Sequence, residues 1–423
     1  MTAKLDKGVM TISTTLAEEE MPVLISSPWR LKYEPDIVSV VIENKVTSVG
    51  MFAFWNCYNL KSVTIPNSVK SIDASAFINC KSLEKITIPN SVKTIGVGAF
   101  DGCASIKSIS IPNSVTNIGD GAFEGCTSLE TVTIPNTVKS IKNVFALCTS
   151  LETITIPNSV TNIDGAFSGC SRLKNVTIPN SVTSMNMTFV MCSSLESVII
   201  PSSVKSISGA FENCKSLKSI IIPNAVTSIE LGTFAGCISL ETVTIPNTMK
   251  NIGMGAFSKC ESLKSVTIPS SVTYIGVGAF EGCKSLMDVK VEWKKPLEIP
   301  VSVFKDKLGL IEDMDLKAAT LYVPTGTKGL YQAAEVWKEF GKIVEYNPTG
   351  SYIATEPTLK AYGSEGVLTV SGLQAGETLI IYDVNGRMVY KGVAKFETEN
   401  VTVQGPGGYI VVHGNQRVKV GVR

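Results

Sequence analysis

One order of hydrophobic and polar residues recurs along most of the chain, from about residue 40 to residue 290. In Ser128–Ile141 this order is Leu-x-x-Val-x-Ile-Pro-x-x-Val-x-x-Ile. The alternation over Leu129–Ile134 predicts a β-strand with one buried face. Pro135 ends this strand, because proline has no N–H to donate to a sheet. Val138 and Ile141 predict a second short extended piece, which leads into the next turn of chain.

Cysteine and phenylalanine repeat in phase with this pattern. The chain has eleven cysteines, spaced by 22 or 23 residues, and each follows a phenylalanine by three residues. A fixed period of this length is typical of solenoids, in which one unit is too short to bury its own apolar side and stacked units share a core. We therefore predict a β-rich solenoid of about eleven 22–23-residue coils with a parallel strand ladder, on the order of 50 Å long.

The cysteine column has two interpretations. It is either an array that binds soft metal ions or forms disulfides between coils, or a column of small inward-facing residues beside stacked phenylalanines. Free cysteine is among the most buried residue types, and the chain has no CxxC pair of the kind that zinc sites use. We favour the structural interpretation and expect no metal, cofactor or catalytic site. The predicted core ladder includes Phe77, Cys80, Phe100, Cys103, Phe123 and Cys126.

A charged residue follows the leucine position of each repeat. Stacking would place these residues about 5 Å apart on neighbouring strands, with only Glu130 beside Glu152 like-charged. The stripe either maintains the strand register, at a few tenths of a kcal/mol per pair, or forms part of a binding face. We favour the first, because alternating signs leave no net field for a ligand. The candidate binding face comprises Lys61, Glu84, Lys107, Glu130, Glu152, Lys174, Glu196, Lys218, Glu241 and Lys264.

Outward strand positions are mostly serine and threonine, and no Tyr or Trp occurs from residue 59 to residue 273. Sugar-binding surfaces and protein hot spots both use exposed aromatic residues. The middle of the array therefore indicates a scaffold, or weak multivalent contact. Aromatic residues return at both ends, and we interpret them as caps over the open core: Trp29, Trp55, Tyr58, Tyr274 and Trp293.

The flanking segments depart from the repeat and divide the chain into four parts. Residues 1–40 form a predicted amino-terminal cap, with a strand in Leu5–Ser13 and a turn at Ser26–Trp29; residues 41–294 are the solenoid. Residues 295–349 form a carboxy-terminal cap, with a strand at Thr320–Pro324 and then a helix whose apolar stripe is Leu330, Ala334 and Trp337 and which ends before Gly341.

Residues 350–423 lack cysteine and predict a small β-sandwich. We expect a hairpin at Asn385–Gly386, between two of its strands. The strands of this part are expected at residues 366–371, 378–383, 387–390, 408–413 and 417–423.

Charge and composition exclude several classes of function. The net charge is +1, which argues against a nucleic-acid partner, because such binding needs a basic surface. His413 is the single histidine, so Ser-His-Asp triads and Cys-His dyads are absent from the repeats.

No apolar run in the sequence approaches the roughly 18 to 20 residues that a transmembrane helix requires. Met1–Lys7 shows no apolar leader, so we expect either a cytoplasmic protein or a chain that begins after a removed signal.

The unit Leu-x-x-Val-x-Ile-Pro-x-x-Val-x-x-Ile-x-x-x-Ala-Phe-x-x-Cys resembles the bacterial leucine-rich repeat class called BspA-like. Lys7–Ser13 with Ser27–Trp29 looks like the leader before such arrays, and Trp337–Val344 like part of their closing cap. The tail is similar to the carboxy-terminal sorting domains of the type IX secretion system, in Tyr382–Arg387, Pro406–Val411 and Val418–Arg423.

This resemblance implies a non-enzymatic cell-surface or secreted protein of a Gram-negative anaerobe. Family members are associated with adhesion to host extracellular matrix proteins such as fibronectin and fibrinogen, and with coaggregation. The resemblance therefore implies protein partners, such as host extracellular matrix proteins or cell-surface ligands, multivalent contact along the ladder, and no fixed binding residues that could be transferred. The alternative is a structural or intracellular protein-interaction scaffold, which the missing leader and the unpaired cysteines favour.

Overall fold

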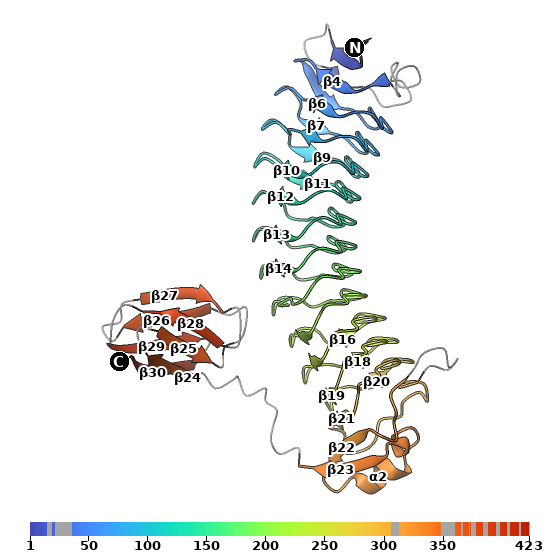
Figure 1. Ribbon diagram of the computed structural model, residues 1–423, viewed down its shortest axis with the longest axis vertical. Coiled ribbons are helices and arrows are strands. Elements are labelled where there is room, and N and C mark those ends of the chain that lie inside the picture. The colour runs from blue at the N-terminus through green and yellow to red at the C-terminus, as the bar shows by residue number, and fades with distance from the viewer. Residues whose placement is uncertain are drawn as a thin grey trace. The chain divides into compact units, whose positions relative to one another are not determined.

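The computed structural model describes residues 1–14, 19–21, 36–305, 313–347, 360–364, 367–371, 373, 378–383, 388–394, 398–403, 407–413 and 416–422. The chain divides into two compact units, Met1–Tyr346 and Asn347–Arg423. Unit 1 is a parallel leucine-rich repeat solenoid, and unit 2 is a small β-sandwich (Figure 1). The predicted fold class is confirmed.

Most repeats of unit 1 contribute a short first strand, and equivalent strands of neighbouring turns pair in parallel within several short sheets. In the described structure, the turn that contains Glu196 has no such strand. Ile109 lies beside Val132 and Ile154 beside Val176, so the apolar positions of each repeat stack in register. The alternation of exposed and buried residues predicted by the sequence is present in these strands. The strands are β4 (Ser39–Ile42), β6 (Ser62–Thr64), β8 (Lys85–Ile86), β10 (Ser108–Ser110), β12 (Thr131–Thr133), β13 (Thr153–Thr155), β14 (Asn175–Thr177), β15 (Ser219–Ile221), β17 (Thr242–Thr244), β19 (Ser265–Ile268) and β21 (Asp288–Val291).

The second extended piece of each repeat forms a further parallel ladder, which is interrupted in the middle of the array. Among the described residues, the four 22-residue turns join this ladder only through single bridges at Ser140, Asn162, Ser184 and Ser206. The strands on either side are β3 (Glu19–Glu20), β5 (Val46–Val49), β7 (Ser71–Ile72), β9 (Thr94–Ile95), β11 (Asn117–Ile118), β16 (Ser228–Ile229), β18 (Asn251–Ile252) and β20 (Tyr274–Ile275).

A column of stacked phenylalanine rings fills the core from Phe54 to Phe304. Where the repeat has 23 residues, ring centroids lie 5.2–5.4 Å apart. Across the 22-residue steps from Phe123 to Phe211, the separation rises to 5.8–6.2 Å. The shorter turns lack one residue between the isoleucine and the phenylalanine, and they are also the turns in which the second ladder weakens. Loss of that residue therefore coincides with looser stacking.

The cysteines form a second buried column beside the rings. All eleven are buried, and none is in a disulfide. Thiols from Cys80 to Cys283 donate S–H bonds to the phenylalanine carbonyl of the preceding turn, at 3.1–3.4 Å. Phe77, Phe100 and Phe123, like the cysteines three residues after them, are completely inaccessible to solvent. A small side chain with a weak donor suits this position, because it fills space and bonds a buried carbonyl.

The amino-terminal end of the solenoid is an antiparallel pair, β1 (Thr2–Asp6) and β2 (Val9–Ser13), and β2 continues the parallel ladder to β4. The turn between them is at Lys7 and Gly8, both of which have positive φ angles. The sequence predicted β2 but not β1. The predicted turn at Ser26–Trp29 lies outside the described residues.

The carboxy-terminal end contains the predicted strand, β22 (Thr320–Pro324), followed by β23 (Lys342–Tyr346). The predicted helix is wrong in extent: α2 (Lys328–Ala333) stops before Ala334, which is extended, and Trp337 lies in the separate 3-10 helix η3 (Trp337–Glu339). Leu330, expected on the apolar stripe, is 52% exposed, whereas its neighbour Tyr331 is fully buried. The helix breaks because the Trp337 ring packs against those of Trp293, Phe304 and Tyr331.

Unit 2 consists of two antiparallel sheets around one apolar core that includes Leu368, Leu379, Ile381 and Val411. The strand order is β24-β25-β28 in one sheet and β27-β26-β29-β30 in the other. The predicted strands are present, and the predicted hairpin turn at Asn385–Gly386 lies outside the described residues. The strands are β24 (Lys360–Ser364), β25 (Val367–Ser371), β26 (Thr378–Asp383), β27 (Met388–Val393), β28 (Thr398–Thr402), β29 (Gly407–His413) and β30 (Gln416–Val422).

Candidate binding surface

The charged residues of the predicted stripe lie just before the first strands of unit 1, except that, among the described residues, no strand directly follows Glu196. Backbone hydrogen bonds connect many of them from turn to turn: the Glu84 N–H donates to the Lys61 carbonyl at 3.1 Å, and the Glu241 N–H donates to the Lys218 carbonyl at 2.8 Å. The side chains are exposed, except that Glu152 is half-buried. The predicted stacking of this position is therefore present, and its role in binding remains a proposal.

Ion pairs join part of this stripe. Lys264 Nζ lies 2.6 Å from Glu241 Oε2, and Lys174 Nζ lies 3.5 Å from Glu152 Oε2. Glu152 also pairs with Arg172, which precedes the stripe position in its own turn. The hydrogen bond and positive charge of Lys264 lower the pKa of the Glu241 carboxyl, with a smaller effect from Lys218. Exposed pairs of this kind contribute little to stability, and their main effect is to neutralise the stripe.

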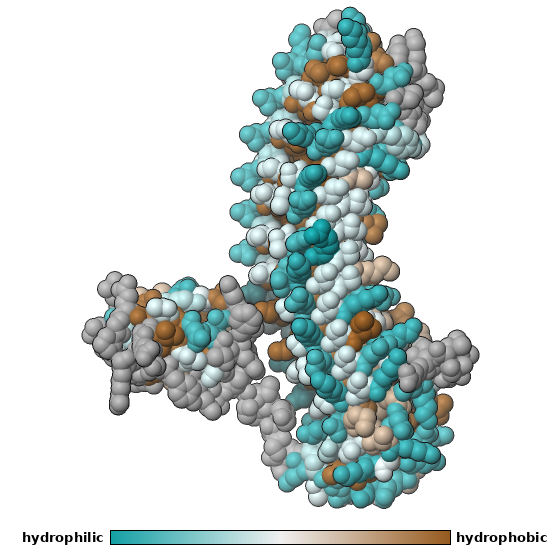
Figure 2. Space-filling model, in the orientation of Figure 1, coloured by the Kyte–Doolittle hydropathy of each residue, from teal (hydrophilic) through white to brown (hydrophobic). Residues whose placement is uncertain are grey.

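Hydroxyl side chains dominate the outward face of the first strands, which we call the strand face. Thr131 and Thr133 on β12, and Thr153 and Thr155 on β13, are all exposed. Ile221, at the equivalent outward position of β15, interrupts this pattern and is 68% exposed. Figure 2 shows hydrophilic and weakly polar residues over most of the visible surface of unit 1, with hydrophobic residues only in separate spots. The strand face therefore offers many hydrogen-bonding groups at a fixed spacing.

A shallow groove of about 310 Å³ lies where the strand face meets the carboxy-terminal cap. We call it the tyrosine groove; its lining includes Ser265, Thr267, Asp288, Lys290, Tyr322 and Tyr346. These residues come from four neighbouring strands, β19, β21, β22 and β23, and Lys290 lies beside Tyr322 in register.

Two tyrosines define the chemistry of the tyrosine groove. The Tyr346 hydroxyl donates to the Val291 carbonyl at 3.0 Å, and Lys290 Nζ lies 4.2 Å from the centre of the Tyr346 ring. Burial, with a smaller effect from the Glu292 charge, raises the pKa of Tyr346 to about 12. Burial and then the charge and hydrogen bond of Asp288 raise the pKa of Tyr322. Both phenols therefore stay neutral hydrogen-bonding groups at physiological pH.

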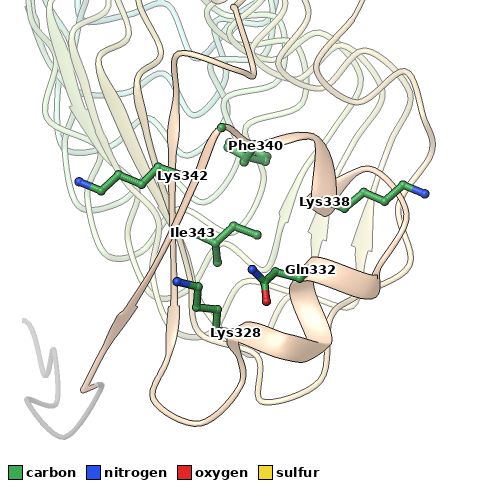
Figure 3. A pocket seen from close by; sticks show the side chains of 7 residues that line it. Lys328, Gln332, Lys338, Phe340, Lys342 and Ile343 are labelled. Carbon is green, nitrogen blue, oxygen red and sulfur yellow. The ribbon is translucent and has the colours of Figure 1, made fainter.

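A second hollow, of about 440 Å³, lies between α2, η3 and β23 in the carboxy-terminal cap. Three lysines line it, Lys328, Lys338 and Lys342. Figure 3 shows Lys338 and Lys342 extending to opposite sides rather than toward a common point. Bound anions require convergent donors, so this geometry does not assemble an anion site.

The buried cysteines are poorly suited to chemistry. Burial raises the pKa of Cys170, Cys237 and Cys283 to about 12, although backbone hydrogen bonds from the thiols partly oppose this shift. The reactive form of cysteine is the thiolate, which is scarce at physiological pH when the pKa is this high. Within the described ranges, no group of three or more His, Cys, Asp or Glu side chains could hold a metal ion. In the same part of the chain, no helix is long and apolar enough to cross a membrane.

Sequence reasoning missed the tyrosine groove. The aromatic residues it singled out at this end lie elsewhere: Tyr274 is 52% exposed on β20, and Trp293 is buried, with its indole N–H donating to the Val272 carbonyl at 2.8 Å. Tyr322 is the tyrosine of the strand pattern Leu-Tyr-Val-Pro and lies at an outward position. This position could have indicated the tyrosine groove from sequence, because an outward tyrosine replaces the usual threonine there.

The stacked parallel turns place unit 1 in the leucine-rich repeat class of solenoids. A family model described as a BspA type leucine rich repeat region matches residues 31–144, 139–210 and 208–318, in six copies. The chain belongs to this family.

Several solved structures are similar to the chain. A leucine-rich repeat protein from Bacteroides ovatus is 27% identical, with a TM-score of 0.60, and the match covers 82% of this chain and 98% of that one. A leucine rich cell surface protein from Faecalibacterium prausnitzii is 24% identical, with a TM-score of 0.47 and coverage of 82% and 95%. The pneumococcal vaccine antigen PcpA is 17% identical, with a TM-score of 0.43 and coverage of 81% and 96%. No curated protein matches the chain.

Proposed function

We propose that the protein is a non-enzymatic, cell-surface or secreted binding protein whose unit 1 contacts host matrix proteins or other cell surfaces. The observation that carries this proposal is the strand face: exposed hydroxyls and alternating charges repeat on successive turns, at positions that stack in register where the strands pair. Such a face presents its side chains to a ligand. Many weak contacts at a fixed spacing then add up through multivalency.

The candidate binding face includes the charged stripe from Lys61 to Lys264 together with the adjacent strand hydroxyls. Alternating charges favour a ligand that is itself mixed in charge, because a strongly acidic or basic partner would meet repulsion at every second turn. Family membership supports the location, since BspA-like leucine-rich repeat proteins are typically surface or secreted.

Binding of the purified full chain to immobilised fibronectin and fibrinogen, measured by surface plasmon resonance, tests the function. We expect saturable binding that weakens when salt screens the exposed charges. Failure to bind either matrix protein above an albumin control would contradict the adhesin role. Fractionation of the producing cells tests the location, and recovery of the protein in the cytoplasm would favour the alternative of an intracellular scaffold.

Unit 2 is proposed to act as a type IX sorting domain that directs the chain to the outer membrane surface. The proposal is based on the resemblance in Tyr382–Arg387, Pro406–Val411 and Val418–Arg423, and a separate small β-sandwich suits a targeting module. Deletion of residues 350–423 should then leave the protein in the periplasm. Unchanged surface display after this deletion would refute the sorting role while leaving the binding role untouched.

A further inference from the structure

We propose that the tyrosine groove binds a sugar ring of a neutral glycan. This inference deepens the proposed function by naming a ligand class and a site, and it relies on that function only for exposure of the protein to extracellular glycans. The tyrosine groove is the place on the strand face where aromatic rings, a carboxylate and an ammonium group lie together. The aromatic-free turns between residues 59 and 273 contain no equivalent.

Size favours a small ligand. The volume of about 310 Å³ lies at the lower end of the range for small-molecule sites. The lining comes from paired strands, so the site is largely preformed, and Tyr346 is held by its hydrogen bond to Val291. A preformed site avoids the ordering cost that weakens binding of small ligands.

The side chains offer the groups that a sugar ring requires. Tyr322 is half-buried and presents an apolar ring for the C–H face of a sugar, while its contact with Asp288 limits its movement. Asp288 and the hydroxyls of Ser265 and Thr267 can accept hydrogen bonds from sugar hydroxyls, and Lys290 can donate to them. An aromatic platform beside convergent polar groups is the arrangement that polar ring ligands need.

Charge selects a neutral ligand. Asp288 and Lys290 lie on the same strand, two residues apart and on the same face, so the tyrosine groove has no strong net field. An acidic glycan would meet the Asp288 carboxylate, and a cation would meet the Lys290 ammonium group. A neutral glycan can use both side chains as hydrogen-bonding partners without a repulsive contact.

The backbone argues against a peptide ligand at this place. Extended peptides commonly bind by adding a strand to an exposed sheet edge. In the tyrosine groove, β21 and β22 each have a paired strand on both sides, so their backbone groups are already used, and among the described strands β23, which carries Tyr346, forms the edge of this sheet. A peptide over Asp288, Lys290 and Tyr322 would be limited to side-chain contacts with a shallow polar surface, whereas a sugar ring needs no backbone partner.

The test is a titration of the purified full chain with neutral di- and trisaccharides of glucose, galactose, mannose and N-acetylglucosamine, followed by calorimetry and saturation-transfer NMR. We expect saturable binding of at least one saccharide. Tyr322→Ala should weaken it about tenfold or more, since it removes the stacking ring. Tyr322→Phe should stay within about threefold, because the ring is kept. Tyr274→Ala is the matched control, an exposed tyrosine outside the tyrosine groove, and should bind like the parent.

The inference is overturned if no saccharide in the panel binds the parent protein, or if a Tyr322→Ala variant with unchanged circular dichroism keeps full affinity. Preferential binding of an acidic saccharide or of a matrix-derived peptide in the tyrosine groove would also overturn it. Binding to fibronectin and fibrinogen is measured on the same variants. A variant that loses sugar binding but keeps matrix-protein binding separates this inference from the proposed function, because the remainder of the strand face still binds matrix protein.

Discussion

The buried cysteine column makes unit 1 sensitive to alkaline pH. In the folded protein, burial raises the pKa of Cys170, Cys237 and Cys283 from 9.0 to about 12. An unfolded chain exposes these thiols, whose pKa then returns to its ordinary value. Because the folded pKa is the higher one, the stabilising contribution is fully present below pH 9 and is lost as the pH rises from 9 through 12.

The loss of stability at alkaline pH can be calculated from these pKa values. At pH 10 an exposed thiol with a pKa of 9.0 is about nine-tenths ionised, whereas a buried thiol with a pKa of about 12 is almost entirely protonated. Ionisation then favours the unfolded chain by about 1.4 kcal/mol per thiol, or about 4 kcal/mol for these three cysteines. The total for the whole column is larger, because the pKa values of other buried cysteines, such as Cys126 and Cys260, are also raised well above 9.0.

Urea unfolding at pH 8 and pH 10, in the presence of reductant and followed by circular dichroism, measures this loss. Cys237→Ala is the matched variant. It lowers stability at both pH values, because it removes packing and an S–H bond to the Phe211 carbonyl. Its stability should nevertheless fall by about 1.4 kcal/mol less than that of the parent between pH 8 and pH 10. An identical pH effect in parent and variant, or thiolate absorbance from the folded protein at pH 10, would refute the reasoning.

Further predictions concern the ring column, the backbone and the charged stripe. Phe167→Ala should lower the free energy of unfolding by about 3–5 kcal/mol in urea titrations, whereas a loss below about 1 kcal/mol would contradict a continuous stack. Met191 has a φ of 59° at a position where Asn213 adopts the same angle. Met191→Asn should therefore raise stability by up to about 1 kcal/mol, whereas Met254→Asn, a control at another exposed methionine, should not. Glu241→Lys should lower the melting temperature by no more than about 2 °C at low salt, and 1 M NaCl should remove the effect; a salt-independent decrease would show that packing, not charge, is responsible.

The sequence predicted the repeating part of the fold because the phenylalanine and cysteine contacts recur from turn to turn. A fixed spacing places each Phe and Cys above its equivalent, and the ring column from Phe54 to Phe304 follows from that spacing. The same argument located the charged stripe. It did not predict how the side chains pair, because Arg172 lies outside the stripe and competes with Lys174 for Glu152.

Prediction was weaker where the period ends. After Cys283 the next paired strands are 32 residues apart, since Asp288 lies beside Thr320, so the repeat spacing no longer indicates which residues are neighbours. The tyrosine groove depends on this register and could not be found from spacing. The broken helix had a different cause: local periodicity favoured one continuous helix, but burial of Trp337 against the end of the ring column required an extended residue at Ala334.

The central claim is that the strand face of unit 1 is its binding surface, and an arginine block of that face tests it most directly. One full-length variant carries arginine at Thr133, Thr155 and Thr177 on the strand face, and the matched control carries arginine at Thr116, Thr161 and Thr183, which are exposed threonines outside it. Both variants gain the same charge. Surface plasmon resonance on immobilised fibronectin and fibrinogen should show at least about tenfold weaker binding for the strand-face variant and parental binding for the control. Equal binding by the two variants, or loss confined to the control, would contradict the claim.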